Sequence, residues 1–148
     1  MKRLKVLTVV GALPEIICLA RVLQKLDASP AIKHVLVHTG QNYDHELNEV
    51  FLEDLVLRQP DYYFNAAGSN ATSTAGQILI HIDPVQEAVK PDAFLVLGDM
   101  NSCLCAIAAK NGIFPSFIWK PRIVVLINGC LPIYINSVES QRYVYVSW

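Results

Sequence analysis

The chain has 148 residues, of which 53% are hydrophobic and 17% charged, so it can form one globular domain with a sizeable core. Its net charge of −1 provides no basic excess for nucleic acid, and its longest apolar stretch is too short to span a bilayer, which needs about 20 residues. The apolar run near the amino terminus ends at Gly11 and consists of strand formers rather than a signal peptide, so we expect a cytoplasmic protein without a membrane or nucleic-acid partner.

Residues 5–26 contain the pattern around which the chain is organised. The β-branched, apolar run 6–10 predicts a strand that is buried on both faces. Gly11 ends this strand, and Pro14 with Glu15 suits the first turn of a helix, whose apolar residues recur at spacings of three and four. A strand, a glycine turn and a helix form the opening unit of a Rossmann-like, doubly wound α/β domain, in which ligands bind at the carboxyl ends of the strands.

Further strands are predicted at residues 32–38 and 93–97, and another begins within 113–117. Residues 62–64 form either a short strand or a packed connection. Because right-handed crossovers leave few alternatives, strands near 4–10, 32–38 and 93–97 should be parallel neighbours with helices on both faces of the sheet.

The helical segments are less regular. A helix around residue 50 is expected to present one apolar face, made of Leu47, Val50, Phe51 and Leu55. Residues 66–74 are small and polar and are expected to form a solvated loop, although such small residues would also permit close approach of a phosphate or sugar. The following helix, 75–89, contains Pro84, so we expect a second short helix to start at Asp83 and Pro84. A small-residue helix is predicted over 103–110.

The cysteines lack paired CxxC spacing, so we expect buried free thiols and no metal site. They are Cys18, Cys103, Cys105 and Cys130. Three of the four histidines have no clustered partners in the sequence and are expected at the surface. They are His34, His45 and His81.

Three polar, glycine-containing turns follow predicted strands, at residues 11–15, 38–41 and 98–102. They should converge at one edge of a parallel sheet, where helix N-termini could receive phosphate, which suggests a nucleotide or nucleotide-sugar cleft. The dinucleotide pattern GxGxxG is absent from the sequence. Asp99 is either a functional carboxylate or a helix N-cap, a role that Asn101 or Ser102 could also fill. His38 is either a ligand-binding residue or a hydrogen-bonding residue of its turn.

Four segments carry a family resemblance: GALPEII from residue 11, HTGQNYDHELNEVFLEDL from residue 38, QPDYYFNAAGSNA from residue 59, and KPDAFLVLGDMNSCLCAIAAK from residue 90. Together they resemble the N-terminal half of the non-hydrolysing UDP-N-acetylglucosamine 2-epimerases, particularly the capsule and O-antigen branch associated with N-acetyl-L-fucosamine synthesis. The resemblance covers roughly residues 3–117.

The resemblance implies the first of two Rossmann-like domains that face each other across a cleft, as in the B-type glycosyltransferases, and usually a homodimer. It also implies a UDP-sugar substrate and inversion at C2, by elimination of UDP and its re-addition to the resulting glucal. Carboxylates act as acid and base in this chemistry, and the resemblance implies no metal and no cofactor.

Only some of the family's site residues are present in this sequence. Gly11, Pro14 and Glu15 match the family turn G-T-R-P-E, but Leu13 stands in place of its arginine, and Cys18 replaces a basic residue of the following helix. Both cations that the family is thought to use for the nucleotide-sugar are therefore missing.

The resemblance assigns catalysis to Asp99, which occupies the aspartate of the motif G-D-T/N, although Met100 departs from the usual threonine. The residues that it and the strand-end pattern nominate for substrate binding are Gly11, Pro14, Glu15, His38, Gly40, Gln41 and Gly98.

The last part of the chain departs from the family. Relatives continue with I-F-H-M-E-A-G-N-R-C-F-D-Q-R-V-P, and reading those codons one base late can give residues 116–131 at every position except Arg122. We therefore expect an epimerase domain over 1–117 and an aberrant tail over 118–148, in which the apolar run 123–127 could add a strand at the sheet edge.

The sequence thus predicts a truncated, frame-shifted epimerase that is inactive in this form. Two alternatives remain open. The chain could be a functional single-domain nucleotide-sugar binder, or a non-catalytic partner in epimerase assembly.

Overall fold

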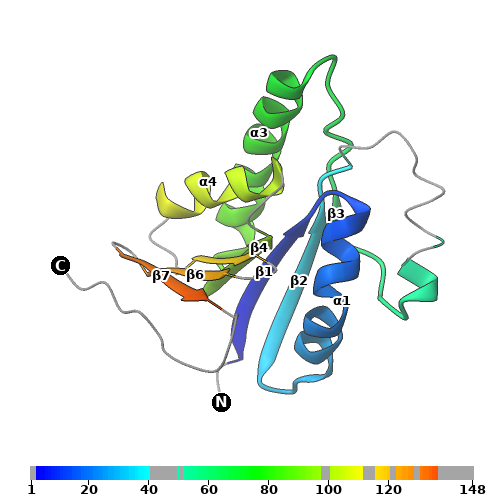
Figure 1. Cartoon of the computed structure of the whole chain (residues 1–148), viewed down its shortest axis with the longest axis vertical. Helices are drawn as coiled ribbons and strands as arrows, with labels where there is room; N and C mark the ends of the chain where they lie inside the picture. The colour runs from blue at the N-terminus through cyan, green and yellow to red at the C-terminus, as the bar shows by residue number, and fades with distance from the viewer. Residues whose placement is uncertain are drawn as a thin grey trace.

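The computed structural model of the protein describes residues 3–40, 50, 52–97, 101–111, 116–120, 123–128 and 131–136. Within this part of the chain, a sheet of seven strands has the order β3-β2-β1-β4-β5-β6-β7 (Figure 1). The strands are β1 (Leu4–Val10), β2 (Ile32–His38), β3 (Tyr62–Tyr63), β4 (Ala93–Leu97), β5 (Ser116–Lys120), β6 (Ile123–Asn128) and β7 (Leu131–Asn136). The helices are α1 (Leu13–Ala28), α3 (Ala71–Val89) and α4 (Cys105–Asn111), with a 3₁₀ turn, η1 (Asn101–Leu104), before α4.

The first strand lies at the centre of the parallel part of the sheet. It pairs in parallel with β2, where Leu4 faces Ile32, and with β4, where Val6 faces Ala93. The predicted parallel arrangement of these three strands is therefore confirmed. Residues 62–64 prove to contain a strand, since β3 pairs with the end of β2.

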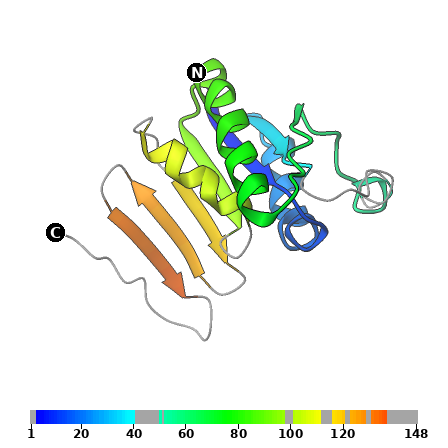
Figure 2. The ribbon, with the colours of Figure 1, turned by 90° about the horizontal axis from the view of Figure 1, so that it is seen from above.

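Helices cover both faces of this sheet, as Figure 2 shows from above. On one face, α1 buries Ile16 and Leu23 in a cluster with Leu36 of β2. On the other face, α3 and α4 pack over Phe94 and its neighbours in β1, β2 and β4. Because both faces are covered, the central strands have no polar alternation, and the predicted doubly wound α/β fold is confirmed.

Helix α3 differs from its prediction at its start and at Pro84 in its interior, while its end at Val89 is as predicted. It begins at Ala71, because Asn70 caps it by accepting a hydrogen bond from the Ser73 amide at 2.8 Å, so residues 71–74 are helical and not loop. It also continues through Pro84 without a new start. Ile82 and Val85 are buried against the sheet on either side of the exposed proline, and this packing offsets the missing backbone hydrogen bond.

The predicted apolar face around residue 50 is confirmed at Leu55, which packs against the cluster beneath α1, and is wrong at Val50. Leu52 is buried, with 3% of its surface exposed, whereas Val50 is 54% exposed. Leu52 and Leu55 are three residues apart, a spacing that places them on the same face of a helix, whereas the prediction assigned Val50 to that face. Leu47 and Phe51 lie outside the described residues.

The segment after residue 115 continues the sheet. Strand β5 is parallel to β4, and β6 and β7 then add antiparallel strands beyond it. The run 123–127 thus lies in a strand, as its composition suggested, and a second added strand, β7, follows it.

Candidate functional site

The carboxyl ends of β1 and β2 meet beside the start of α1. The Thr39 amide donates a 2.8 Å hydrogen bond to the Val10 carbonyl, which holds the turn after β2 against the end of β1. Ser102, from the turn region after β4, reaches Glu15 in the first turn of α1. The structure therefore brings the three predicted turns together. Gln41, Gly98 and Asp99 themselves lie outside the described residues.

Glu15 is the buried centre of this edge. One carboxylate oxygen accepts hydrogen bonds from the amides of Gly11 and Ala12, at 2.6 and 2.7 Å, and the other accepts one from the Ser102 hydroxyl. Burial raises the pKa of Glu15, while these hydrogen bonds act in the opposite direction. Glu15 thus fastens two strand-end turns to each other from within the protein.

The environment of Glu15 corrects one expectation about phosphate. The amides of Gly11 and Ala12 already bind the carboxylate, and Pro14, which is exposed, has no amide hydrogen to offer. Because an anionic side chain of the same helix occupies these donors, the start of α1 is not an open phosphate cradle.

The turn after β2 is built around His38 and Gly40. His38 is fully buried, accepts a hydrogen bond from the Gly40 amide at 3.0 Å, and stacks on Tyr63 with ring centroids 5.0 Å apart. Gly40 has a φ of +61°, and a Cβ atom there would lie 2.8 Å from the Tyr63 ring and 2.9 Å from the backbone of Asn65. A side chain at this position would therefore be excluded by both conformation and space. His38 does form the turn hydrogen bond that the sequence left open as one of its two roles.

Thr39 is a polar residue that sequence reasoning missed. It is fully buried between His38 and Gly40, and its hydroxyl has no hydrogen-bond partner within the described part of the chain. A buried hydroxyl without a partner is costly and is uncommon away from functional sites. The available signal was its position between two nominated residues in the segment HTGQ.

His34 is not a surface residue, which corrects the sequence prediction. Its side chain is 2% exposed and bridges α1 and β1, with Nδ1 2.6 Å from Asp27 and Nε2 3.0 Å from the Thr8 hydroxyl. Burial lowers the pKa of His34, and Asp27 only partly reverses this effect. The partners were not visible in the sequence because one of them lies 26 residues away, on a neighbouring strand.

Arg58 completes this polar group near the amino-terminal side of the sheet. Its guanidinium donates to Asp27 at 2.9 Å, to Asp61 at 2.8 Å and to the His34 carbonyl at 3.1 Å. The group joins α1, β2 and the segment before β3, and it lies apart from the strand-end turns. Its role in the structure is to hold these elements together. Of the other two histidines, His81 donates a 2.7 Å hydrogen bond from Nδ1 to the Gln77 carbonyl and stacks on Phe64. His45 lies outside the described residues.

The cysteines divide by burial. The expectation of a buried thiol is confirmed for Cys105, whose pKa is raised by burial and by the nearby Glu15. It is wrong for Cys18, which lies on the exposed side of α1, whereas Cys103 is half-buried and Cys130 lies outside the described residues.

In the part of the chain that the structure describes, no cluster of histidine, cysteine or acidic residues could hold a metal ion. Nor does that part contain a helix long and apolar enough to cross a membrane.

Comparison with known sequences identifies relatives of this chain. Residues 24–115 match the family model described as UDP-N-acetylglucosamine 2-epimerase. A UDP-2,3-diacetamido-2,3-dideoxy-D-glucuronate 2-epimerase from Pseudomonas aeruginosa is 34% identical over 108 residues, which cover 73% of this chain and 30% of that protein. A UDP-N-acetylglucosamine 2-epimerase from Methanococcus maripaludis is 35% identical, over 72% of this chain and 28% of its own. The chain therefore spans about 30% of the length of the relatives it matches.

Solved structures have the same fold over the same part of the chain. The structure of UDP-N-acetylglucosamine 2-epimerase from Rickettsia bellii matches with a TM-score of 0.68 and 47% identity, covering 77% of this chain and 30% of that one. The enzyme from Methanocaldococcus jannaschii, solved in complex with UDP-GlcNAc and UDP, matches with a TM-score of 0.71 and 30% identity, covering 76% and 31%.

Proposed function

We propose, since this chain belongs to the UDP-N-acetylglucosamine 2-epimerase family, that the carboxyl edge of its sheet forms one side of a nucleotide-sugar site for C2 epimerisation. The observation that carries the proposal is the convergence of three turns: Glu15 and Ser102 join the turns after β1 and β4, and the Thr39 amide holds the turn after β2 against the end of β1. A related structure holds UDP-GlcNAc and UDP, which supports a UDP-sugar as the ligand class. The reaction would eliminate UDP from C1 as a base removes the C2 proton, and would then add UDP back to C1 while an acid returns a proton to the opposite face of C2.

We assign different roles to the nominated residues. Asp99, which follows β4 by two residues in the sequence, would handle a proton of the sugar, because a carboxylate can act as general acid or base. His38 and Gly40 would shape the opposite wall, and the Thr39 hydroxyl would donate to the ligand. Glu15 would hold the turns in place from inside the protein, since its oxygens already accept hydrogen bonds from Gly11, Ala12 and Ser102. The remaining nominated residues would contribute to ligand binding from the same sequence segments: Gly11, Pro14, Gln41 and Gly98.

We also propose that the 148-residue chain does not catalyse the reaction by itself. The matched 108 residues cover only 30% of the Pseudomonas relative, and Leu13 and Cys18 stand where the family carries basic residues. Loss of a single positioned catalytic group typically slows a reaction by about 10² to 10⁴.

Two measurements on the same purified chain test these statements. Ligand-observed NMR with UDP-GlcNAc should detect binding that Thr39→Val weakens and Lys25→Ala, on the far end of α1, does not. A coupled dehydrogenase assay for UDP-N-acetylmannosamine should detect no turnover. Turnover that scales with protein would contradict the proposed inactivity. Absence of UDP-GlcNAc binding would contradict the site itself and would favour the assembly-partner alternative, which co-purification with a full-length epimerase would then test.

The reading-frame proposal concerns residues 116–131. We propose that these residues are a family segment read one base late, so that 1–117 is the epimerase domain and 118–148 an aberrant tail. Sequencing the gene decides this directly, because the earlier frame should encode I-F-H-M-E-A-G or a near relative. A shifted frame that encodes nothing similar to the family would refute it.

The finer family assignment rests on the quoted segments alone. We propose that this chain is cytoplasmic and forms a homodimer, and that its family branch supplies precursors for capsule or O-antigen polysaccharide through N-acetyl-L-fucosamine. Light scattering of the purified chain tests the dimer, with a monomer as the contradicting result.

A further inference from the structure

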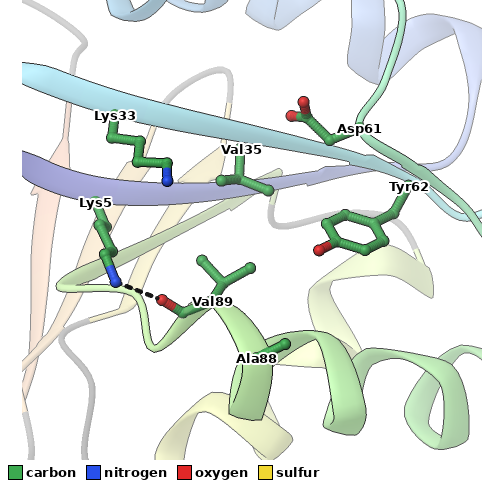
Figure 3. Close-up of a pocket in the computed structure, with 7 residues that line it drawn as sticks. All are labelled: Lys5, Lys33, Val35, Asp61, Tyr62, Ala88 and Val89. Carbon is green, nitrogen blue, oxygen red and sulfur yellow. Dashed lines mark hydrogen bonds between the residues drawn. The ribbon is translucent and has the colours of Figure 1, made fainter.

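A second candidate site lies away from the carboxyl edge, on the side of the sheet that α3 covers. It is a pocket of about 290 Å³ between β1, β2 and the last turn of α3 (Figure 3). Its lining residues are Lys5, Lys33, Val35, Asp61, Tyr62, Ala88 and Val89. Pockets that bind small molecules start at about 300 Å³, so this one would suit a small ligand.

Two lysines from neighbouring strands define one end of the pocket. Lys5 and Lys33 are register partners in the parallel pair β1–β2, so both side chains project from the same face of the sheet. The Lys5 ammonium donates to the Val89 carbonyl at 3.0 Å, as Figure 3 shows, and the Lys33 side chain is exposed. Like charges on adjacent strands are unfavourable unless something compensates them. Among the described residues, no carboxylate forms an ion pair with either ammonium.

The two carboxylates near the pocket accept hydrogen bonds from groups other than the lysine ammoniums. An oxygen of Asp61 accepts from the Leu36 amide and from Arg58, both at 2.8 Å. An oxygen of Asp92, which follows α3, accepts from the backbone amide of Lys5 at 2.8 Å. The lysine end of the pocket is therefore its electropositive end.

The rest of the pocket is largely apolar. Val35, Ala88 and Val89 provide aliphatic surface, and the ring of Tyr62 faces them from beside β2 (Figure 3). A flat, apolar body could lie between Val35 and the Tyr62 ring, with an anionic group extending toward the lysines.

We propose that this pocket binds a small organic anion, with a carboxylate held between Lys5 and Lys33 and an aromatic or branched aliphatic body against Val35, Val89 and Tyr62. The pocket would be a second ligand site, independent of the nucleotide-sugar site, because its residues come from the amino-terminal half of β1 and β2 and the end of α3.

The test uses the ¹⁵N-labelled 148-residue chain and two probes with the same ring system, 2-naphthoate and 2-naphthalenemethanol, in low salt. Binding of 2-naphthoate should shift the backbone amides of Lys33, Val35, Tyr62 and Val89. Lys33→Glu should weaken 2-naphthoate about tenfold or more and leave the neutral alcohol unchanged, since it replaces an attraction by a repulsion. Added salt should weaken the acid selectively.

Lys25→Glu is the matched control, because Lys25 is also exposed and lies on α1, on the opposite face of the sheet. It should leave the affinity of 2-naphthoate within about twofold of the unmodified chain. The proposal is overturned if 2-naphthoate does not bind, if it shifts amides of the carboxyl edge instead, if the acid and alcohol bind equally, or if Lys33→Glu and Lys25→Glu have the same effect.

Discussion

The role of Glu15 can be tested with two substitutions, one that removes its hydrogen-bond acceptors and one that removes only its charge. Glu15→Ala removes the acceptor of three hydrogen bonds, from the Gly11 and Ala12 amides and the Ser102 hydroxyl. Each buried donor left unpaired costs about 1–3 kcal/mol, so the total loss should be about 3 kcal/mol or more. Because a domain is stable by only about 5–15 kcal/mol, this variant should be severely destabilised or unfolded.

Glu15→Gln keeps the hydrogen bonds while it removes the charge. The amide oxygen of glutamine can accept from both backbone amides, and its nitrogen can donate to the Ser102 hydroxyl, which also has lone pairs. We expect this variant to remain folded, with a free energy of unfolding within about 1 kcal/mol of the unmodified chain near pH 5.

The comparison becomes decisive when pH is varied. Since the folded-state pKa of Glu15 is raised above 4.5, the folded protein holds this proton more tightly than the unfolded chain does. The unmodified protein therefore loses stability as pH rises from 4.5 through the folded-state pKa, and Glu15→Gln does not. Urea unfolding from pH 4 to 8 should show the stability of Glu15→Gln relative to the unmodified chain increasing with pH. A difference that decreases with pH would mean that the three hydrogen bonds outweigh burial, and would refute the reasoning.

Three further predictions concern the surrounding framework. Gly40→Ala should destabilise the fold by about 2 kcal/mol or more in urea unfolding, because φ is +61° and the new Cβ would meet the Tyr63 ring; a loss below about 0.5 kcal/mol would contradict this. Val56→Gly should raise the free energy of unfolding by about 1 kcal/mol, because this exposed, β-branched residue has a φ of +53° just after a helical turn, a conformation that favours glycine. A lower melting temperature for the variant would contradict this prediction. The folded-state pKa of His34 is lowered below 6.5, so the unfolded chain binds this proton more tightly. The unmodified chain should therefore lose stability as pH decreases below 6.5, and His34→Gln should lose less. Equal pH dependence of the two proteins in urea unfolding would contradict this prediction.

The parallel core was predictable because its information is local. The β-branched apolar runs of β1, β2 and β4 specify buried strands wherever they occur, and right-handed connections leave little choice of order. Helix α3 was less predictable because Pro84 argues against a helix locally, while burial of Ile82 and Val85, which depends on the sheet beneath them, argues for it.

The candidate site was predictable in outline but not in its connections. The three strand-end turns could be nominated because carboxyl ends of parallel strands share an edge. The link between Glu15 and Ser102 joins residues that are 87 positions apart, so no local pattern could reveal it. The same applies to Arg58, whose partner Asp27 is 31 residues away. The role of Asp99 stays a prediction, since that residue lies outside the described part of the chain.

Arg58 is partly exposed and Glu15 is buried, so added salt should affect the two ends of the sheet differently. Arg58, Asp27 and Asp61 have side chains 26–41% exposed, so salt can screen the attraction that holds α1 to the segment before β3. Glu15 is fully buried, and salt has little access to its hydrogen bonds. Added salt should therefore increase amide hydrogen exchange around residues 58–61 and leave exchange at Gly11 and Ala12 unchanged. The strand-end turns would keep their arrangement while the opposite end of the same sheet loosens.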